Sequence, residues 1–313
     1  MEIVEAGYRE YSTIIAEPYH IFGSAAFNHI NEDKAESVHY LLFKEGKYRL
    51  GMIGGIRNNI FISPFSAPFG GFSFIQEDVR ISYIDEAIQL LNEWVKKKGV
   101  KEIKITLPPT IYHESFLSKQ INSLYRNGFM IEKTDLNYAY CLQQFDQNYA
   151  ASIWYNARKN LKIALANNFS FRLGETADEK QTAYNIIKQN REARGFPLRM
   201  TWEQVQLSVS VIPADFFLVS NRDLLPVAAA VVFHLKPGVV QVIYWGDLPE
   251  HAHLKTMNFL SFKIFEYYHK LKLDIIDIGP STENSIPNYG LCEFKESIGC
   301  GISCKFSFTK LVA

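Results

Sequence analysis

Three arginines in one short stretch could bind an anionic group. Arg191, Arg194 and Arg199 lie within nine residues, around a break in the chain at Gly195-Phe-Pro197. A guanidinium group can form two parallel hydrogen bonds with a carboxylate or a phosphate, so three of them on one turn suit either ligand. The alternative is a solvated helix end, where the helix dipole favours cations. The sequence leaves both interpretations open.

Further polar residues could bind a ligand or move a proton, and each also has a simpler structural interpretation. Arg158, Lys159 and Lys162 share one face of a predicted helix, which could meet phosphate or face solvent. Tyr244 ends a predicted strand, where its phenol could point into a cleft or pack in the core. Asp277 could act as a base, although a carboxylate at a strand end is more often hydrogen-bonded or solvated.

Metal binding is not expected. His251 and His253 are two residues apart, but they lie in a predicted loop with Pro249 and have no evident third ligand. The four cysteines form no C-x-x-C pair, and we expect them to be reduced thiols.

The composition and the motif search exclude several classes of protein. Lys+Arg and Asp+Glu both number 33, so the net charge gives no support to tRNA binding, although a local basic face stays open. The chain begins with no signal peptide and contains no transmembrane run, which predicts a cytoplasmic protein. Glycine motifs for dinucleotides or P-loop phosphates are missing, so nicotinamide oxidoreductases and P-loop NTPases lose their main support. The oligomeric state stays open.

Both halves of the chain end with the same order of predicted elements: a hairpin, a helix, a strand, a Pro-containing loop, a helix, a glycine and a strand. The first half contains strands over 38–44 and 48–56, a broken strand over 60–74, a helix ending at Gly99, a strand over 100–107, a helix over 113–126 and a strand over 129–142. The second half contains a long helix over 149–166, a strand over 169–173, helices over 177–193 and 202–209, strands over 215–220, 225–235 and 239–245, a helix over 257–271, a strand over 273–278, a helix over 291–297 and a strand over 302–309.

Matching positions in the two halves indicate a duplicated unit. Pro108 and Pro280 are 172 residues apart, and Gly128 and Gly299 are 171 residues apart. A run of antiparallel strands followed by a helix and another strand predicts mixed α/β sheets, not a doubly wound Rossmann sheet. We therefore expect two tandem domains, residues 1–145 and 146–313.

The stretch 277–299 carries the most specific motif, because Asp277-Ile-Gly279, Phe294-Lys295 and Gly299 follow one another in a fixed order. Weaker motifs are RKNLK at 158–162, REARGFPLR at 191–199, IYWGD at 243–247 and SPFSAPFGG at 63–71. Together with the tandem order of elements, these motifs resemble the FemAB family of peptidoglycan-bridge aminoacyltransferases. That family is built from two GNAT-like (acyl-CoA N-acyltransferase-like) domains, and the resemblance would cover most of the chain.

The resemblance implies an N-acyltransferase whose active site lies in the second domain. In the family the Phe-Lys pair lies in the active site, which implies that Lys295 stabilises the oxyanion of the tetrahedral intermediate while Phe294 shapes the pocket. The matching position in the first half is Leu124, so we expect no catalytic site there. Lys295→Ala should abolish transfer with little loss of stability. The candidate substrate-binding residues are Arg158, Arg191, Arg194, Arg199 and Tyr244.

The acyl donor stays open. A GNAT domain holds the pyrophosphate of acetyl-CoA on a loop R/Q-x-x-G-x-G/A before a helix, but residues 247–255 contain no glycine. The donor is then an aminoacyl-tRNA, an acyl-CoA bound in another way, or none. The helical arm of tRNA-using family members is also missing.

The resemblance implies an acceptor amine on a cell-wall precursor, a peptide or a sugar. Two alternatives stay open, because a fold does not fix its substrate. One is a non-catalytic binding module for an anionic or acylated ligand. The other is an acyltransferase acting on another polysaccharide or on a lipid-linked amine.

Overall fold

The computed structural model describes residues 1–196 and 198–312. The fold is the mixed α/β fold predicted from the sequence, and it divides into two compact units. Unit 1 comprises Met1–Leu136, Asn284–Ile286 and Ser303–Ala313, and unit 2 comprises Asn137–Glu283 and Pro287–Ile302. No helix in the described residues is long and apolar enough to cross a membrane.

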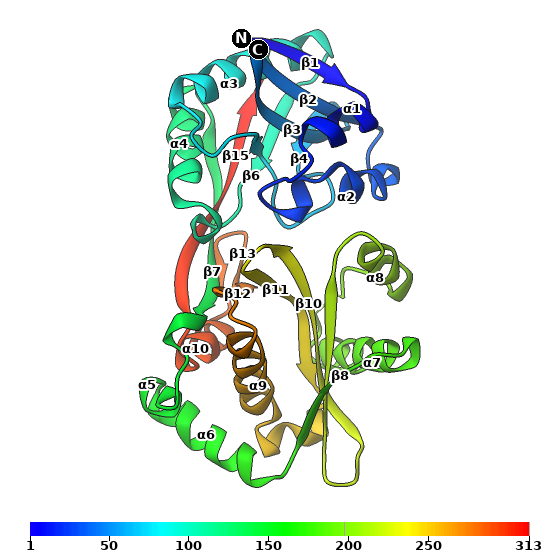
Figure 1. The fold of residues 1–313 in the computed structure, drawn as a ribbon, viewed down its shortest axis with the longest axis vertical. Coiled ribbons are helices and arrows are strands. Elements are labelled where there is room, and N and C mark those ends of the chain that lie inside the picture. The colour runs from blue at the N-terminus through cyan, green and yellow to red at the C-terminus, as the bar shows by residue number, and fades with distance from the viewer. Residues whose placement is uncertain (197, 313) are drawn as a thin grey trace. The chain divides into compact units, whose positions relative to one another are not determined.

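Unit 1 is built on a mixed sheet with helices on both faces. The strands, in order across the sheet, are β1 (Glu2–Ala6), β2 (Ser37–Glu45), β3 (Lys47–Arg57), β4 (Ile60–Ser63), β6 (Glu102–Thr106), β15 (Gly301–Leu311) and β7 (Met130–Cys141), while β5 (Phe72–Phe74) pairs with β3. Strands β4 and β6 run parallel. Helices α3 (Ile81–Lys97) and α4 (Glu114–Arg126) cover one face, and α1 (Tyr8–Ile14) and α2 (Ala25–His29) cover the other (Figure 1). Short 3₁₀ helices span Ile21–Gly23, Glu32–Lys34 and Thr110–Tyr112.

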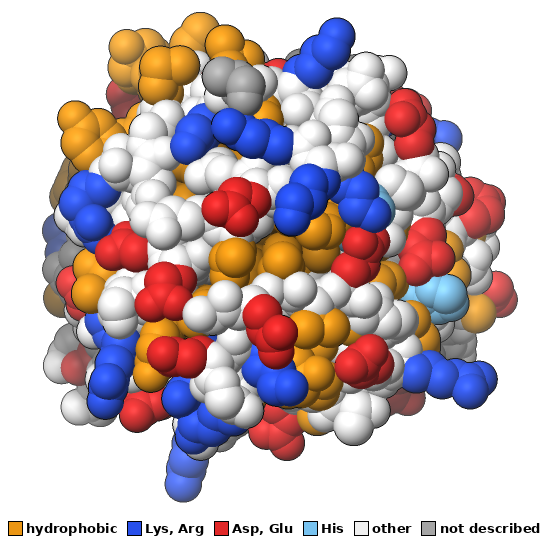
Figure 2. Space-filling view, turned by 90° about the horizontal axis from the view of Figure 1, so that it is seen from above, with side chains coloured by type: hydrophobic (Ala, Val, Ile, Leu, Met, Phe, Trp, Pro, Cys, Tyr) orange, Lys and Arg blue, Asp and Glu red, His pale blue; other side chains and the backbone are white. Residues whose placement is uncertain are grey.

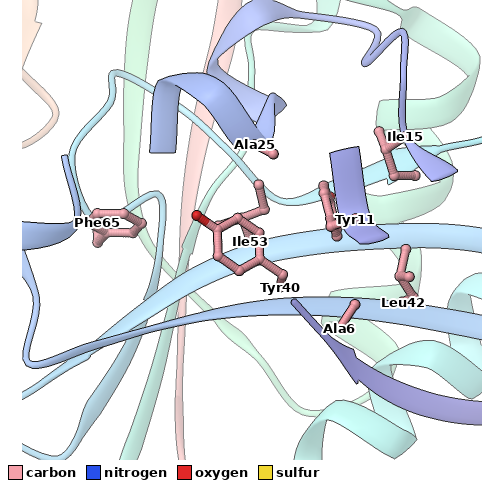
Figure 3. Close-up of a cluster of buried hydrophobic side chains, with 8 residues drawn as sticks. All are labelled: Ala6, Tyr11, Ile15, Ala25, Tyr40, Leu42, Ile53 and Phe65. Atoms are coloured by element: carbon pink, nitrogen blue, oxygen red, sulfur yellow. The ribbon is translucent and has the colours of Figure 1, made fainter. Parts of the chain in front are cut away.

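One core of unit 1 lies between the sheet and helices α1 and α2 (Figure 3). Tyr40 and Leu42 alternate along β2, so both side chains point to this face. The ring of Tyr11 from α1 lies 5.6 Å from the ring of Tyr40, measured between centroids. The buried members of the cluster are Ala6, Tyr11, Ile15, Ala25, Tyr40, Leu42, Ile53 and Phe65.

The opposite face of the sheet packs against α3. At this contact, a side chain of one strand lies close to the backbone of the neighbouring strand. Phe61 of β4 is fully buried, and its ring lies directly over Gly54 of β3, so that a Cβ at Gly54 would overlap the ring. Trp94 of α3 meets the other side of this contact, with its ring 5.7 Å from that of Phe61. The absence of a side chain at Gly54 is therefore what lets the two layers approach.

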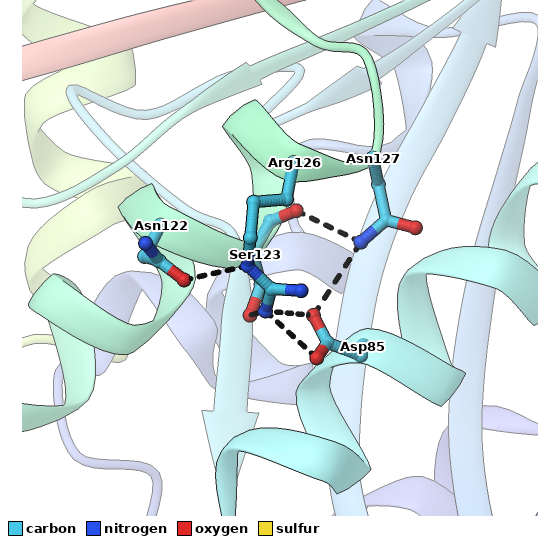
Figure 4. A network of polar contacts seen from close by, with 5 residues as sticks. All are labelled: Asp85, Asn122, Ser123, Arg126 and Asn127. Atoms are coloured by element: carbon cyan, nitrogen blue, oxygen red, sulfur yellow. Dashed lines mark hydrogen bonds and ion pairs between the residues drawn. The ribbon is translucent and has the colours of Figure 1, made fainter.

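A polar network joins the ends of α3 and α4 (Figure 4). Nη2 of Arg126 lies 2.7 Å from both carboxylate oxygens of Asp85, and Nε donates to Oδ1 of Asn122 at 2.8 Å. Nδ2 of Asn127 also donates to Asp85, at 3.4 Å. The ion pair is partly exposed and so contributes about 0–1 kcal/mol. Burial of the apolar face of α3 must supply most of the packing energy.

Unit 2 is likewise built on mixed strand pairing with helices on both faces. Its strands, in order, are β7, β12 (Ile275–Pro280), β11 (Val239–Asp247), β10 (Pro226–Lys236), β9 (Ala214–Ser220) and β8 (Ser170–Leu173). Helix α7 (Ala177–Ala193) packs on β9, β10 and β11, whereas α9 (Thr256–Lys270) packs on β10, β11 and α6 (Tyr155–Ala166) (Figure 1). The remaining helices are α5 (Tyr149–Ser152), α8 (Trp202–Val209), α10 (Tyr289–Ser297) and the 3₁₀ helices Leu142–Gln144 and Pro249–Leu254, and β13 (Thr282–Glu283) pairs with β14 (Ile286–Pro287).

The last strand of each half of the sequence pairs with a strand of the other half. In unit 1, β15 lies antiparallel to β6, with Phe308 opposite Ile105. In unit 2, β7 lies antiparallel to β12, with Tyr140 opposite Ile276. The predicted halves, 1–145 and 146–313, therefore each contribute a strand to the sheet of the other unit.

Most of the predicted elements are confirmed, including both hairpins and helices 177–193 and 202–209. The single helix predicted over 149–166 is wrong, because α5 ends at Ser152 and α6 begins at Tyr155. The backbone of Ile153 is extended and its side chain is buried. The N–H group of Trp154 donates to the carbonyl of Ser297, which replaces a helical hydrogen bond with a tertiary one.

The surface in Figure 2 carries Lys and Arg side chains interspersed with Asp and Glu. This mixture agrees with the equal numbers of acidic and basic residues in the chain. Charge on this face therefore acts locally, through particular groups, and not as a field of one sign.

Gly54→Ala should destabilise unit 1, because the new methyl group must displace the buried ring of Phe61. We expect a loss of about 1–3 kcal/mol in the free energy of unfolding, measured by chemical denaturation. Gly7→Ala is the matched control, because a Cβ at Gly7 meets nothing within 4 Å, and it should cost less than about 0.5 kcal/mol. Equal losses for the two variants would contradict the close packing at Gly54.

Candidate functional site

The neighbouring parallel strands of unit 2 stop pairing well before they end. Strands β11 and β12 pair over three positions, the last being Gln241 opposite Asp277, although β11 continues to Asp247 and β12 to Pro280. The pairing of β10 with β11 also skips Ile243, which marks a β-bulge. We call the point after Gln241 and Asp277 the strand divergence. Backbone groups beyond it need partners outside this strand pair.

A buried carboxylate fixes the strand divergence. Asp277 has no exposed surface, and its Oδ1 accepts hydrogen bonds from Nδ2 of Asn137 and from the N–H of Gly279, both at 2.8 Å. Its Oδ2 accepts from Nε2 of Gln241 at 2.7 Å. These donors come from β7, β11 and β12, so one side chain ties three strands together. Amide donors at both oxygens favour a structural role for Asp277 over the alternative role of a base.

Lys295 of α10 is the buried cation at the strand divergence. Only 2% of the residue is exposed, and its Nζ donates to the carbonyls of Ile278 and Gly279 at 2.8 Å and to that of Pro280 at 3.1 Å. An ammonium group has three N–H donors, so all three are used. Pairing of β12 with β7 is irregular between Asp277 and Pro280, so Lys295 satisfies carbonyls in an irregular part of the strand.

Burial lowers the pKa of Lys295 to about 8, and the positive charge of Arg191 acts in the same direction. The negative charge of Asp277 opposes this shift. The ammonium group is therefore present at neutral pH and titrates slightly above it, whereas an exposed lysine titrates near 10.4.

The predicted role of Lys295 beside an oxyanion stays a prediction, but the geometry adds a condition. The N–H groups point at carbonyls of the chain itself, so one must leave a carbonyl before it can donate to an oxyanion. The expectation that Lys295→Ala has little effect on stability has to be revised, because removing the ammonium group leaves three carbonyls without their donor.

Arg191 lies in the electrostatic environment of Lys295, and Tyr244 lies in that of Arg191. Arg191 is near the end of α7 and is partly buried, and burial lowers the pKa of its guanidinium. Burial raises the pKa of Tyr244, and the positive charges of Arg191 and Arg199 oppose this rise. The phenol oxygen of Tyr244 accepts the N–H of Met200 at 3.2 Å. Within the described residues, the guanidinium of Arg191 forms no ion pair or side-chain hydrogen bond.

The other two arginines of the predicted turn have acidic partners. Arg194 lies 3.7 Å from Oδ1 of Asp247, and Arg199 lies 3.2 Å from Oε1 of Glu283. Both arginine side chains are more than half exposed, so these pairs are weak. Pro197 of the predicted turn lies outside the described residues. Arg191 is therefore the arginine of this turn best placed to receive an anion.

Phe294 and Arg158 have different positions. Phe294 is partly buried on α10, and its ring lies 6.1 Å from that of Trp245 on β11, so it borders the strand divergence. Arg158 is exposed on α6, where its guanidinium lies over the ring of Tyr155. No contact in the described part of the chain joins Arg158 to Arg191 or Lys295.

The start of α9 is occupied by a buried acid. Asp247 is 2% exposed, and its Oδ2 accepts the hydroxyl of Thr256 at 2.5 Å. Asn190 of α7 donates to the carbonyl of Asp247 at 2.7 Å and to its Oδ1 at 3.2 Å. This carboxylate sits next to the helix end where a GNAT loop would hold pyrophosphate, and its negative charge opposes such binding.

The contact between Asn190 and Asp247 was not predicted from the sequence, although one signal for it was present. Ala183, Ile187 and Asn190 follow one another on the buried face of α7, and an amide on such a face needs a buried partner. Gln241 and Asn137 carry the same signal, because each is a polar residue in an otherwise largely apolar strand.

Comparisons with solved structures show the fold. FemX superposes with a TM-score of 0.72 at 12% identity, covering 99% of this chain and 97% of FemX. L-PGS from Bacillus licheniformis gives a TM-score of 0.60 at 12% identity, with coverage of 97% and 92%. A tandem GNAT protein from the clavulanic acid biosynthesis pathway gives 0.56 at 9% identity, with coverage of 100% and 98%. Neither a protein-family model nor a curated protein matches the sequence.

These likenesses confirm the predicted fold, two tandem GNAT-like domains. Fold similarity at this identity carries neither substrate nor catalytic residues over to this chain. The case for function therefore rests on the side chains at the strand divergence.

Lys295→Met should lower the free energy of unfolding by roughly 3 kcal/mol, because the apolar chain fills the same space but leaves the carbonyls of residues 278–280 without their donor. Chemical denaturation measures this loss. Lys159→Met is the control, because Lys159 is exposed on α6, and it should change stability by less than about 0.5 kcal/mol. A loss below 1 kcal/mol for Lys295→Met would show that the carbonyls do not depend on Lys295.

Proposed function

We propose that this chain is an N-acyltransferase that moves an acyl or aminoacyl group onto an amine, with its active site at the strand divergence of unit 2. One observation carries the proposal. The buried ammonium group of Lys295 lies in the same electrostatic environment as the guanidinium of Arg191, which is partly buried and forms no ion pair within the described residues. Buried positive charges are costly, and their concentration at one place favours a site for an anionic or developing negative charge.

Acyl transfer to an amine passes through a tetrahedral oxyanion, which a fixed positive charge stabilises. Lys295 supplies such a charge once an N–H group moves from the carbonyl of Pro280, its longest contact, to the oxyanion. On the β11 side, backbone groups from Val242 to Asp247 have no partner on β12. An extended donor can pair with them as an added strand would. Phe294 and Trp245 border the place where such a donor would lie.

The proposed acceptor is an amine on a cell-wall precursor, a peptide or a sugar. Arg191 suits the carboxylate or phosphate that such acceptors carry, because its guanidinium has no ion pair or side-chain hydrogen bond to displace among the described residues. The resemblance to the FemAB family supports this acceptor class. An acceptor on another polysaccharide, or one linked to a lipid, would use the same arginine and stays an alternative.

The proposed donor is an aminoacyl-tRNA or an acyl-CoA whose carrier is held away from the start of α9. The carboxylate of Asp247 already occupies hydrogen-bond donors there, and the 3₁₀ helix Pro249–Leu254 replaces a glycine loop. A pyrophosphate group at this place would meet like charge.

A non-catalytic binding module is the second candidate, and one observation favours it. All three donors of Lys295 are committed to the chain itself, whereas Arg191 is free to bind. A protein that only holds an anion through Arg191 needs no movement of Lys295.

Arg191→Gln tests the site directly. Under the acyltransferase proposal it raises the KM for the acceptor roughly tenfold or more, because a hydrogen bond to a charged group is lost. The assay offers acetyl-CoA, longer acyl-CoAs and charged tRNA as donors, and UDP-linked peptides, amino sugars and lipid-linked amines as acceptors. Arg9→Gln, an exposed position on α1, is the control and should leave KM unchanged.

Two outcomes would count against the acyltransferase. An unchanged KM in Arg191→Gln removes that residue from the site. Failure of every donor, together with an anion-induced thermal shift that Arg191→Gln abolishes, selects the binding module.

The pH dependence of turnover separates two roles for Lys295. Its pKa is lowered to about 8, so the charge is complete well below pH 8 and disappears as the pH rises through that value. If the ammonium group stabilises the oxyanion, kcat falls above pH 8, and an active Lys295→Arg variant keeps its activity to higher pH. A kcat that rises through pH 8 and loses this limb in Lys295→Arg would instead assign Lys295 the role of a base.

A further inference from the structure

We propose that unit 1 carries a separate anion-binding site, for a phosphate or diphosphate group, in a pocket at the start of α3. The pocket has a volume of about 140 Å³ and lies where the beginning of β3 meets the segment between β5 and α3. Its lining includes the three cationic residues Lys47, Arg49 and Arg80 and one acid, Asp78. The proposal does not depend on the function proposed for unit 2.

The cations of this pocket come from two elements. Lys47 and Arg49 are two residues apart on β3, and both line the pocket. Arg80 is the residue that precedes α3. In the described part of the chain, no ion pair joins any of the three to an acid. The nearest polar partner of Lys47 is neutral, because its Nζ donates to Oε1 of Gln76 at 2.8 Å. The positive charge of the pocket is therefore not neutralised by contact.

Both arginines are held on one aromatic ring. The guanidinium of Arg49 lies over the ring of Tyr83 at 4.8 Å from the centroid, and that of Arg80 lies over the same ring at 5.9 Å. Cation–π contacts restrict both side chains and bring two like charges together without a carboxylate between them. Such an arrangement is costly by itself and is relieved by an anion that meets both groups.

Arg49 has a donor that needs an acceptor. Its Nε is shielded from solvent and has no hydrogen-bond partner among the described residues. A buried donor without a partner costs about 1–3 kcal/mol, and a turn of the Arg49 side chain toward the pocket would let an oxygen of a bound anion remove that cost. The residue before α3, Arg80, offers no side-chain acceptor to the first turn of this 17-residue helix, so the helix end adds to the positive potential.

The arrangement favours phosphate over a carboxylate. Donors from Lys47, Arg49 and Arg80 approach from separate elements, which suits the three or four oxygens of a tetrahedral group better than the two oxygens of a planar one. The volume admits one or two phosphate groups.

Isothermal titration with inorganic phosphate, pyrophosphate and ADP tests the site. All titrations use the full chain carrying Arg191→Gln, which removes the other candidate anion site. We expect binding that is stronger for pyrophosphate than for phosphate, and a reduction of at least tenfold on adding Arg49→Gln or Arg80→Gln. Adding Arg9→Gln is the control and should change nothing. A higher affinity for ADP than for pyrophosphate shows that a nucleotide is the source, and equal affinities show that the phosphate groups alone are recognised.

Two results would overturn the proposal. One is no binding of any of the three probes at millimolar concentration. The other is binding that neither arginine substitution weakens. Arg80 is exposed, so Arg80→Gln stays informative even if the substitution at Arg49 impairs folding.

Discussion

Strands β11 and β12 pair over only three positions, and the backbone groups beyond that point must find other partners inside unit 2. The carbonyls of residues 278–280 find theirs in a single side chain, Lys295, whose three donors match three acceptors. A buried ammonium group is tolerated only when its donors are used in this way. The amides around Asp277 complete the arrangement by fixing the last paired position.

The candidate chemistry follows from this constraint. Burial lowers the pKa of Lys295, and this residue lies in the same electrostatic environment as Arg191. Beyond Gln241, β11 has no paired position on β12. The carboxylate of Asp247 closes the place where a GNAT loop would hold pyrophosphate. Unit 2 therefore combines a GNAT-like fold with strands that diverge after Gln241 and Asp277. Unit 1 has a leucine, Leu124, at the position that matches Lys295, and its own cations gather at the start of α3.

The fold was largely predictable from the sequence because its signals are local. Hairpins at residues 44–47 and 236–238, and the apolar periodicity of helices such as 177–193, depend on near neighbours in the chain. The break at Ile153 was not predictable, since it depends on a hydrogen bond to Ser297. The same reason limits how much of the site can be predicted from the sequence. The motif identified Lys295, but its burial among carbonyls 15 to 17 residues away depends on tertiary structure, as does the contact between Asn190 and Asp247.

The protonation of Lys295 can be followed by NMR through its Cε resonance in protein labelled with ¹³C-lysine, and it shows whether the ammonium group is buried among the carbonyls of residues 278–280. Lys295→Arg assigns the signal by removing it. We expect a single titration near pH 8, well separated from those of the exposed lysines, because the ammonium group is buried at the strand divergence. A titration near 10.4 would mean that Lys295 is solvated and does not bind the carbonyls of residues 278–280, and the proposed site would lose its buried charge.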